Sequence, residues 1–494
     1  MAAYLEDTIA AIATATGRGA IAILRISGRE ARTVAARILR PALGAGAREK
    51  AQPADIGGEP RATDPGFDPP NEGGHRGFSL EDSHRARRAL LLDPDQGTAL
   101  DDVLVLPMHA PGTATGEDVV EIHCHGSALL ADRALRAALA NGARTAAPGE
   151  FTRRAFLNGR LDLCQAEAVA DLAEATSEAG LHAAWQQLEG RLSARIEALR
   201  GGVLDARALV EAHLDFPEED LPPESSSELR TQLDALRYQI ETLCATFARG
   251  RLARDGVRVA LIGRPNVGKS SLMNAFLGRE RALVSDRPGT TRDWLEEPLA
   301  LGDHQILLSD TAGIRQTADG IEQAGMERSR AHLDAADLVV LVFDGSTPLT
   351  EEDHQLLGEL GDKPVVHVRN KADCERAWSD DALAAAGVGS APLAISALRG
   401  DGLETLSSAI LERLDLRDER ATEEVRITRA RHHEALRSGA AALERALRLL
   451  SEGAGLDLVA CELQAATADL DALLGLSTPE DVLDRIFERF CIGK

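Results

Sequence analysis

Residues 263–270 (GRPNVGKS) have the types and the spacing needed to hold the phosphates of a nucleotide. They fit the pattern Gly-x4-Gly-Lys-[Ser/Thr] and directly follow an apolar, strand-like run at residues 257–262. The glycines let backbone N–H groups turn toward phosphates, at the positive end of the helix that follows. Lys269 is expected to reach the terminal phosphates, and the hydroxyl of Ser270 to bind Mg²⁺. The strand context and the complete spacing argue against an ordinary Gly-rich turn.

Later segments carry the other groups that hydrolysis of a nucleoside triphosphate needs, in chain order. Residues 289–293 (GTTRD) provide a switch threonine, and residues 305–310 (QILLSD) predict a strand that delivers Asp310 to the metal shell. Gly313 can offer its backbone amide to the γ-phosphate. Ile314 occupies the position where many Ras-like proteins have a water-orienting Gln, and its side chain cannot orient water. Another group must therefore position the nucleophile.

Residues 370–373 (NKAD) indicate which base is bound. They follow a strand-like run at residues 364–369, and residues 394–397 (AISA) are expected to close over the base. The Asp373 carboxylate can accept from both N–H donors on the edge of guanine. Adenine lacks this donor pair, so a site built for it rejects ATP. Asn-Lys-x-Asp alone is weak evidence, but all these elements in order predict a GTP-hydrolysing domain.

We assign GTP binding to these loops as a group. The assigned residues are Asn266, Val267, Gly268, Lys269, Ser270, Ser271, Ser285, Asp286, Arg287, Pro288, Gly289, Thr290, Thr291, Asp310, Thr311, Ala312, Gly313, Asn370, Lys371, Ala372, Asp373, Ser396, Ala397 and Leu398. Asn266 has a second candidate role, because its side-chain oxygen could bind a monovalent cation where an arginine finger would place its charge. Carbonyl groups of residues 285–290 could close over that ion. Residue chemistry alone equally allows Asn266 only to shape the loop.

The elements that must position these residues follow from apolar periodicity and composition. Residues 8–28 predict two short strands around a Gly-Arg-Gly turn. Helical spacing dominates on both sides of the nucleotide segment. Because the ends of a compact domain often lie close together, we favour one discontinuous helical domain with an insertion over two separate bundles. The predicted fold class is an α+β N-terminal domain plus a discontinuous α-helical domain with an inserted α/β P-loop (Ras-like) domain. The N-terminal domain is expected to span residues 1–158, with a disordered Pro- and Gly-rich insertion at about 50–82. The helical domain comprises residues 159–254 and 417–494, and the inserted P-loop domain comprises residues 255–416.

Composition limits the compartment and the partners. The chain has 494 residues, a formal net charge of −24 and six scattered cysteines without a Cys-x-x-Cys pair. This predicts free thiols in a reducing cytosol. No apolar run approaches the ~20 residues that span a bilayer, so we expect a cytoplasmic protein without membrane contact. Nucleic-acid binders usually have a basic surface, so contact with RNA is expected to need a local basic patch or a basic partner. His123 and His125 alternate on one predicted strand without further ligands, and we assign no metal there.

Several segments together closely resemble the MnmE (TrmE) family of bacterial tRNA-modification GTPases, of the TrmE-Era-Der class. They are residues 17–19 (GRG), 24–28 (LRISG), 115–121 (TGEDVVE), 148–152 (PGEFT), 155–158 (AFLN), 161–163 (LDL), 165–168 (QAEA), the nucleotide elements above and the terminal 491–494 (CIGK). The likeness spans nearly the whole chain outside the insertion. A Cys-x-Gly-Lys ending combined with a GTPase domain is highly specific.

The resemblance implies a homodimer with a folate-binding, dimerising N-terminal domain, and an FAD-containing partner, MnmG (GidA), in a heterotetramer that acts on tRNA. Such proteins add aminomethyl or carboxymethylaminomethyl groups to C5 of the wobble uridine (U34). The one-carbon donor is a tetrahydrofolate derivative, 5-formyl or 5,10-methylene. The resemblance also implies K⁺-stimulated hydrolysis as two GTPase domains meet across the ion. It places K⁺ at Asn266, Ser285, Arg287 and Thr290, Mg²⁺ at Ser270 and Thr291, and the water-orienting carboxylate at Glu322.

The resemblance maps the folate contacts to Arg25, Glu121, Arg160 and Lys494. Glu121 can bind the N–H edge of a pterin, and cations suit the glutamate tail of a folate. Without the resemblance, Arg25, Glu121 and Arg160 read as ordinary surface charges. The chain departs from the family pattern at three positions. Arg160 stands where lysine is usual, Ser127 where glycine is usual, and Leu398 where arginine or lysine is usual.

Cys491 is the second candidate catalytic residue. A free cysteine is most often a small buried residue. A four-residue terminus gains little from burial, however, and a thiol near Lys494 is suited to nucleophilic chemistry. We therefore expect Cys491 to serve the modification rather than GTP hydrolysis, with a structural role as the alternative.

Two rival functions remain at this stage. A ribosome-assembly or translation GTPase would act as a switch without modification chemistry. Relatives of that kind carry RNA-binding appendages, and neither a folate-like N-terminal domain nor a Cys-x-Gly-Lys tail. A stand-alone folate-dependent enzyme would use GTP only for regulation. The composition of wobble uridines in cells that lack the gene separates these possibilities.

Overall fold

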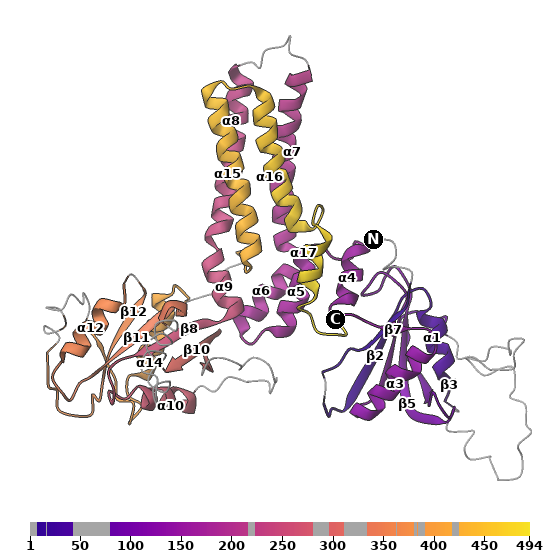
Figure 1. Cartoon of the computed structure of the whole chain (residues 1–494), viewed down its shortest axis with the longest axis horizontal. Coiled ribbons are helices and arrows are strands. Elements are labelled where there is room, and N and C mark those ends of the chain that lie inside the picture. The colour runs from indigo at the N-terminus through magenta and orange to yellow at the C-terminus, as the bar shows by residue number, and fades with distance from the viewer. Residues whose placement is uncertain are drawn as a thin grey trace, which may run out of the picture. The chain divides into compact units, whose positions relative to one another are not determined.

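The computed structural model describes residues 7–15, 17–42, 80–215, 223–279, 296–310, 333–361, 363–379, 383, 391–416 and 424–494. The chain divides into two compact units, Met1–Ala170 with Leu474–Lys494, and Asp171–Leu473. Each unit has its own β-sheet (Figure 1). Most of the predicted insertion at residues 50–82 lies outside the described residues. Among the described helices, none combines the length and apolar character needed to cross a bilayer.

The sheet of the first unit has the strand order β3-β4-β5-β6-β2-β1-β7. Its strands are β1 (Ile9–Ile12), β2 (Ile21–Ser27), β3 (Leu39–Pro41), β4 (Arg87–Leu92), β5 (Ala99–Met108), β6 (Val119–His125) and β7 (Arg144–Thr145). The predicted pair of strands within residues 8–28 is confirmed, because β1 and β2 are antiparallel. Leu24 and Ile26 of β2 are buried in one core with residues of α1 (Ala31–Ile38) and α3 (Ala128–Ala140). This core covers one face of the sheet.

The C-terminal segment of the chain packs with the first unit. Here α4 (Glu150–Leu157), the start of α5 (Leu163–Glu174) and α17 (Glu480–Phe487) share a small aromatic core. Phe156 and Phe487 have ring centroids 6.4 Å apart, and Phe487 and Phe490 are 5.3 Å apart. Arg153 of α4 also pairs with Asp484 of α17 at 2.7 Å. The tail that ends in residues 491–494 therefore starts from a packed helix.

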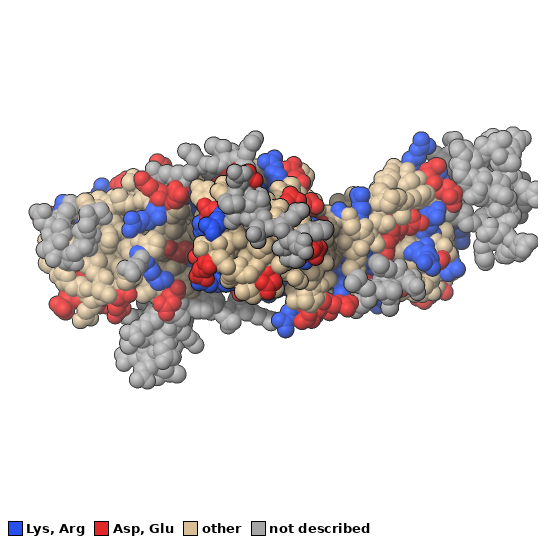
Figure 2. All heavy atoms as spheres, turned by 90° about the horizontal axis from the view of Figure 1, so that it is seen from above, with Lys and Arg blue, Asp and Glu red and all other residues tan. Residues whose placement is uncertain are grey.

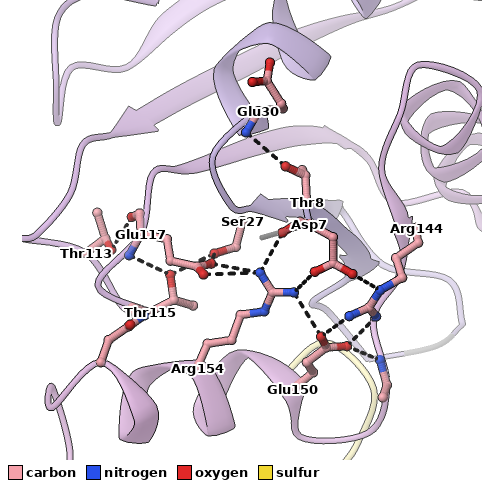
Figure 3. A network of polar contacts seen from close by, with 12 residues as sticks. Asp7, Thr8, Ser27, Glu30, Thr113, Thr115, Glu117, Arg144, Glu150 and Arg154 are labelled. Atoms are coloured by element: carbon pink, nitrogen blue, oxygen red, sulfur yellow. Dashed lines mark hydrogen bonds and ion pairs between the residues drawn. The ribbon is translucent and has the colours of Figure 1, made fainter. Parts of the chain in front are cut away.

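A buried ion network holds the N-terminal segments of the first unit together (Figure 3). The side chain of Arg154 is only 1% exposed and contacts three carboxylates, Asp7 at 2.6 Å, Glu150 at 3.0 Å and Glu117 at 3.1 Å. Arg144 contacts Asp7 and Glu150 as well. Burial by itself raises the pKa of the Glu150 carboxyl, but hydrogen bonds, chiefly from Arg144, outweigh it and lower the pKa. The Glu150 carboxylate therefore stays ionised at neutral pH.

Helices from both sides of the inserted α/β segment pack against each other in the second unit (Figure 1). They are α6 (Glu178–Leu188), α7 (Arg191–Asp215), α8 (Pro223–Ala245), α9 (Phe247–Asp255), α15 (Ala430–Glu452) and α16 (Leu456–Leu474). The α8 helix packs against both α7 and α15. Buried residues of α15, such as Leu436, Ala440 and Leu443, recur at helical spacing. The predicted fold class, with a discontinuous helical part, is confirmed, whereas the exact domain limits stay a prediction.

The inserted segment forms a sheet in the order β13-β12-β11-β8-β10-β9. Its strands are β8 (Val257–Ile262), β9 (Glu296–Leu301), β10 (His304–Asp310), β11 (Leu338–Asp344), β12 (Val365–Asn370) and β13 (Leu393–Ala394), and its helices include α10 (Lys269–Arg279), α12 (Glu351–Glu359) and α14 (Leu403–Arg413). All neighbouring strands are parallel except β9 and β10. Every residue of β11 is buried, as is typical of a parallel sheet with helices on both faces.

Acidic and basic side chains are interspersed on the face of the molecule shown in Figure 2. No broad basic area stands out among the described residues on that face. The expectation that RNA contact needs a local basic patch or a basic partner therefore stays a prediction.

Replacing Arg154 by Met should strongly destabilise the first unit. The substitution leaves Glu150, which is 3% exposed, next to other carboxylates with one cation fewer. Breaking a buried ion pair on one side costs about 3–5 kcal/mol. Urea unfolding followed by hydrogen exchange of the β1 and β2 amides measures the loss. As a control, Arg88→Met removes the exposed Arg88–Asp102 pair and should change little. Equal effects of the two substitutions would contradict a structural role for the network.

Candidate functional site

The parallel strands bring residues that are distant in sequence to one edge of the inserted sheet. At their carboxyl ends, β8 leads into residues 263–270, β10 ends at Asp310, β11 ends at Asp344 and β12 ends at Asn370. Strand β8 lies between β10 and β11 in the sheet. Ligands of open α/β sheets bind at such a point, outside the carboxyl ends of the strands. Among the described residues, the predicted loops at 263–270 and 370–373 therefore meet at the expected edge.

The phosphate-binding loop closes tightly around its lysine. Gly268 has a φ of 97°, and a Cβ at this position would overlap the side-chain nitrogen of Asn370. The side chain of Lys269 is buried, and its ammonium donates to the carbonyls of Gly263 at 2.6 Å and Arg264 at 2.8 Å. Helix α10 begins at Lys269, so its N-terminal amides point toward the loop. This geometry fits a phosphate group and supports the predicted role of Lys269.

Asn370 joins three loops through one amide group. Its side-chain nitrogen donates to the carbonyl of Val267 at 2.8 Å, and its side-chain oxygen accepts from the backbone of Ala397 at 3.0 Å. The backbone of Ala372 donates to Ile395 at 2.9 Å. Asn370 is 2% exposed. The predicted phosphate loop, residues 370–373 and residues 394–397 are thus brought together.

Asp373 lies beside Ser396, whose hydroxyl donates to one carboxylate oxygen at 2.6 Å. The Ser396 oxygen in turn accepts from the backbone of Arg399 at 3.2 Å. The hydrogen bond from Ser396 is the main cause that lowers the pKa of the Asp373 carboxyl. An ionised carboxylate accepts hydrogen bonds only, which suits the two donors on the guanine edge. Leu398 is 85% exposed at the rim of this group.

Sequence reasoning missed Asp344, which fixes the position of Lys371. The Asp344 carboxylate accepts from the Lys371 ammonium at 2.6 Å and from the Ser346 hydroxyl at 2.6 Å. Burial by itself raises the pKa of Asp344, but the hydrogen bonds from Lys371 and Ser346 outweigh it and lower the pKa. Trp378 donates its indole N–H to the Asp344 carbonyl at 2.8 Å. The signal was an acidic residue that ends an apolar strand, as Asp310 does.

Much of the predicted metal and hydrolysis machinery lies outside the described residues. This concerns Ser285, Asp286, Arg287, Pro288, Gly289, Thr290, Thr291, Thr311, Ala312, Gly313 and Glu322. Of the remainder, Asp310 ends β10 opposite Leu261 of β8. Ser270 is exposed in the first turn of α10, and Asn266 is exposed in the loop with a φ of 65°. Both are placed where a ligand at the loop can reach them.

Three of the four predicted folate residues are brought to one place in the first unit. Arg25 of β2 pairs with Glu121 of β6 at 2.9 Å, and it donates to the carbonyl of Gly493 at 3.4 Å. Its guanidinium lies 5.6 Å from the centre of the Phe151 ring. The carbonyl of Lys494 accepts from the backbone of Phe151 at 3.2 Å. Arg25 and Glu121 are partly buried, so the interpretation as solvated surface charges is wrong for them.

Arg160 is not joined to that group by any contact that the structure describes. Its side chain is exposed and lies next to Gly116. Of the neighbouring histidines, His123 lies 3.3 Å from Glu121 of that group, and His125 lies 2.7 Å from Asp101. Among the described residues, no cluster of three or more His, Cys, Asp or Glu suits a metal ion.

The backbone of residues 491–494 is held against the first unit, and the Cys491 thiol is accessible. Gly493 has a φ of 98°, and a Cβ there would overlap the carbonyl of Ile12. The carbonyl of Cys491 accepts from the backbone of Gly149 at 3.4 Å. The side chain of Cys491 is exposed. A role as a small buried core residue, the alternative for this cysteine, is therefore wrong.

Known proteins and family models match almost the whole chain. The family model described as the GTP-binding protein TrmE N-terminus matches residues 8–160, and the MnmE helical domain matches residues 163–491. The tRNA modification GTPase MnmE of Moorella thermoacetica is 43% identical over 496 residues, which cover 99% of this chain and 100% of the relative. That of Heliobacterium modesticaldum is 42% identical over 495 residues, covering 99% of each chain.

Among solved structures, the G domain of the FeoB iron transporter from T. maritima is 30% identical, covers 32% of this chain and 98% of that chain, and has a TM-score of 0.25. The two family models together cover residues 8–160 and 163–491, and the matches to the curated relatives extend over the full length. The chain belongs to the MnmE family of tRNA modification GTPases.

Proposed function

We propose that this chain hydrolyses GTP in residues 255–416 and, with an FAD-containing partner (MnmG, GidA) and tRNA, modifies C5 of the wobble uridine U34. The observation that carries the GTP part is the joined group of Asn370, Asp373 and Ser396 beside the phosphate loop. The names of the full-length relatives support the tRNA part. Mass spectrometry of wobble uridines from cells that lack the gene tests the whole proposal.

GTP selection follows from the chemistry of Asp373. The oxygen that accepts from Ser396 is held in place, which orients the carboxylate toward a base. Both donors of guanine then meet an ionised acceptor. Lys269, the amides at the start of α10 and Ser270 would hold the phosphates and their Mg²⁺, together with Thr291 and Asp310. The ion supplies charge stabilisation as negative charge develops on the transferred phosphate.

Asn266 would complete a K⁺ site with Ser285, Arg287 and Thr290, and Glu322 would orient the water. This proposal is supported by Ile314, because an isoleucine cannot orient the nucleophilic water. Another group must therefore do so. The exposed position of Asn266 in the loop leaves its side chain accessible to a cation. Two copies of the chain would close over the ions in a homodimer.

The one-carbon chemistry is proposed for the place in the first unit where Arg25 and Glu121 meet residues 493–494, which we call the tail site. Arg25, Glu121 and the carboxyl-terminal Lys494 would hold a tetrahydrofolate derivative, 5-formyl or 5,10-methylene, with Arg160 as a further contact. The close approach of Arg25, Glu121 and Gly493 supports this assignment. Cys491 would serve the modification as a catalytic thiol, which its exposure supports. We propose the cytoplasm as the compartment.

The Asp373→Asn variant should exchange base specificity. The new amide presents a donor that suits the 2-oxo group of xanthine and opposes the guanine amino group. We expect GTP affinity to fall by roughly 10⁴-fold, as for a site whose buried polar groups lose their partners, and xanthosine triphosphate to bind better than GTP. Titration with both nucleotides measures the ratio. Unchanged GTP binding would contradict the assignment of residues 370–373.

Hydrolysis should be faster in K⁺ than in Na⁺. We expect a difference in kcat of roughly 100-fold at matched ionic strength, the size of one lost transition-state charge contact. Asn266→Ala should abolish the difference, because it removes the proposed oxygen ligand. Asn274→Ala, an exposed amide further along α10, serves as the control and should keep it. Equal wild-type rates in the two salts would remove the cation hypothesis.

Cys491→Ser should separate the two activities. The Cys491 side chain is exposed, and the residue is held through its backbone carbonyl. We therefore expect wild-type folding, GTP affinity and hydrolysis. Modification of tRNA with the flavin partner should be lost. Cys461→Ser, which changes another exposed cysteine on α16, should leave modification intact. Full modification by the Cys491 variant would make this thiol incidental.

A further inference from the structure

The inserted α/β segment joins the helices of the second unit at two places, which we call the crossings. The first crossing is residues 254–257, from the end of α9 into β8. The second is residues 424–429, which return the chain to α15. Any displacement of the inserted segment that reaches the helices along the chain must pass through these two crossings.

One carboxylate holds an arginine from each crossing. Asp171 of α5 accepts from Arg254 at 3.0 Å and from Arg429 at 2.7 Å through the same oxygen, and its other oxygen accepts from Arg429 at 3.1 Å. The Asp171 side chain is 6% exposed, and Arg429 is 13% exposed. The Arg429 contact is bidentate, a geometry that restricts orientation as well as adding energy. Arg254 also lies 3.3 Å from Asp255, whereas Asp171 contacts an arginine of each crossing.

The surrounding contacts tie the same helices to the nucleotide sheet. The backbone of Ile427 donates to the Thr246 hydroxyl at 3.2 Å, which joins the second crossing to the residue before α9. The backbone of Ala179 in α6 donates to Asp303, in the turn between β9 and β10, at 3.0 Å. Strand β10 continues to Asp310 at the nucleotide edge. The crossings and this turn therefore form one junction.

The junction is not close-packed. A cavity of about 170 Å³ lies there, lined among others by Glu178, His182 and Arg191 of the helices, by Asp303 of the turn, and by Glu424 and Arg426 of the second crossing. The pocket is open to solvent, because Glu178, His182 and Arg191 in its lining are exposed. It leaves space for the turn, the helices and the second crossing to shift, while Asp171 holds an arginine of each crossing.

We propose that Asp171 is a positioning residue that makes the two crossings move as one hinge, so that the nucleotide state of the inserted segment is transmitted to the helices. The inference rests on the proposed function. Without the carboxylate the two crossings lose the side chain that holds an arginine of each, and hydrolysis no longer moves the helices in a defined way. Leu163 and Ala166, earlier in the same helix as Asp171, belong to the core that holds Phe487 and Phe490 before the tail.

The test is the Asp171→Asn variant of the full chain. GTP turnover by the chain alone should stay within about twofold of wild type, because Asp171 does not touch the nucleotide loops. Modification of tRNA with the flavin partner should fall by about tenfold or more, the size of a typical lost coupling. The matched control is Asp471→Asn, which breaks the Arg200–Asp471 pair between α7 and α16 but leaves the crossings intact. That control should keep modification, and Asp171→Glu should restore part of it.

A second measurement separates this inference from the proposed function, because it needs neither tRNA nor the flavin partner. Spin labels carried by unnatural amino acids at the exposed Glu404 of α14 and Glu444 of α15 report the distance across the junction. In the wild type we expect a narrow distance distribution that shifts between GDP and GDP with aluminium fluoride. In Asp171→Asn the distribution should be broad and should no longer shift.

If Asp171→Asn fails to fold, Arg254→Gln releases the first crossing alone and should broaden the distribution too. Wild-type distance distributions in both variants would overturn the inference, even if tRNA is modified. If the wild-type protein shows the expected distance shift but does not modify tRNA, the proposed function is overturned instead. A narrow wild-type distribution that does not respond to the nucleotide would also overturn the inference.

Discussion

The amide of Asn370 is the constraint on which the nucleotide site depends. It binds the phosphate loop on one side and the loop at Ala397 on the other, and it is almost completely buried. An amide can do this because it has a donor and an acceptor on one rigid plane. A carboxylate at the same position could not donate to Val267, and an aliphatic residue would leave two backbone groups without partners. The phosphate and base regions are therefore held in register before a ligand binds.

The first unit uses charge in a different way. Segments 115–121 and 148–152 carry the resemblance to the family. In them Glu117 and Glu150 contact Arg154, whereas Glu121 pairs with Arg25 of the proposed folate site. Segment 148–152 also contacts the tail, because the backbones of Gly149 and Phe151 donate to the carbonyls of Cys491 and Lys494. The tail itself is held mostly by backbone hydrogen bonds and by a glycine that lies against Ile12. This arrangement fixes the position of the last residues and leaves the Cys491 side chain accessible.

In the second unit, single polar side chains join segments that are far apart in the chain. Asp171 binds Arg254 and Arg429, just as Asn370 binds Val267 and Ala397. The chain carries a net charge of −24, so carboxylates are abundant, and a buried carboxylate shared by two arginines restricts geometry. Exposed pairs such as Arg88 and Asp102 add little, because water screens them.

The sequence by itself determined the fold class and the loops of the nucleotide site. Local patterns suffice for this, because a glycine-rich loop between an apolar strand and a helix is specified within a few residues, and the helices show their 3.6-residue period directly. Only the tertiary structure decided that Asp344 supports Lys371, that Arg25 meets Gly493, and that Asp171 holds both crossings. Each of these contacts joins residues of different segments, and the side chain of a lone Asp or Arg looks the same in sequence whether it is solvated or buried against a partner. Pairing between distant segments is a property of the packed chain, and no local spacing along the sequence encodes it.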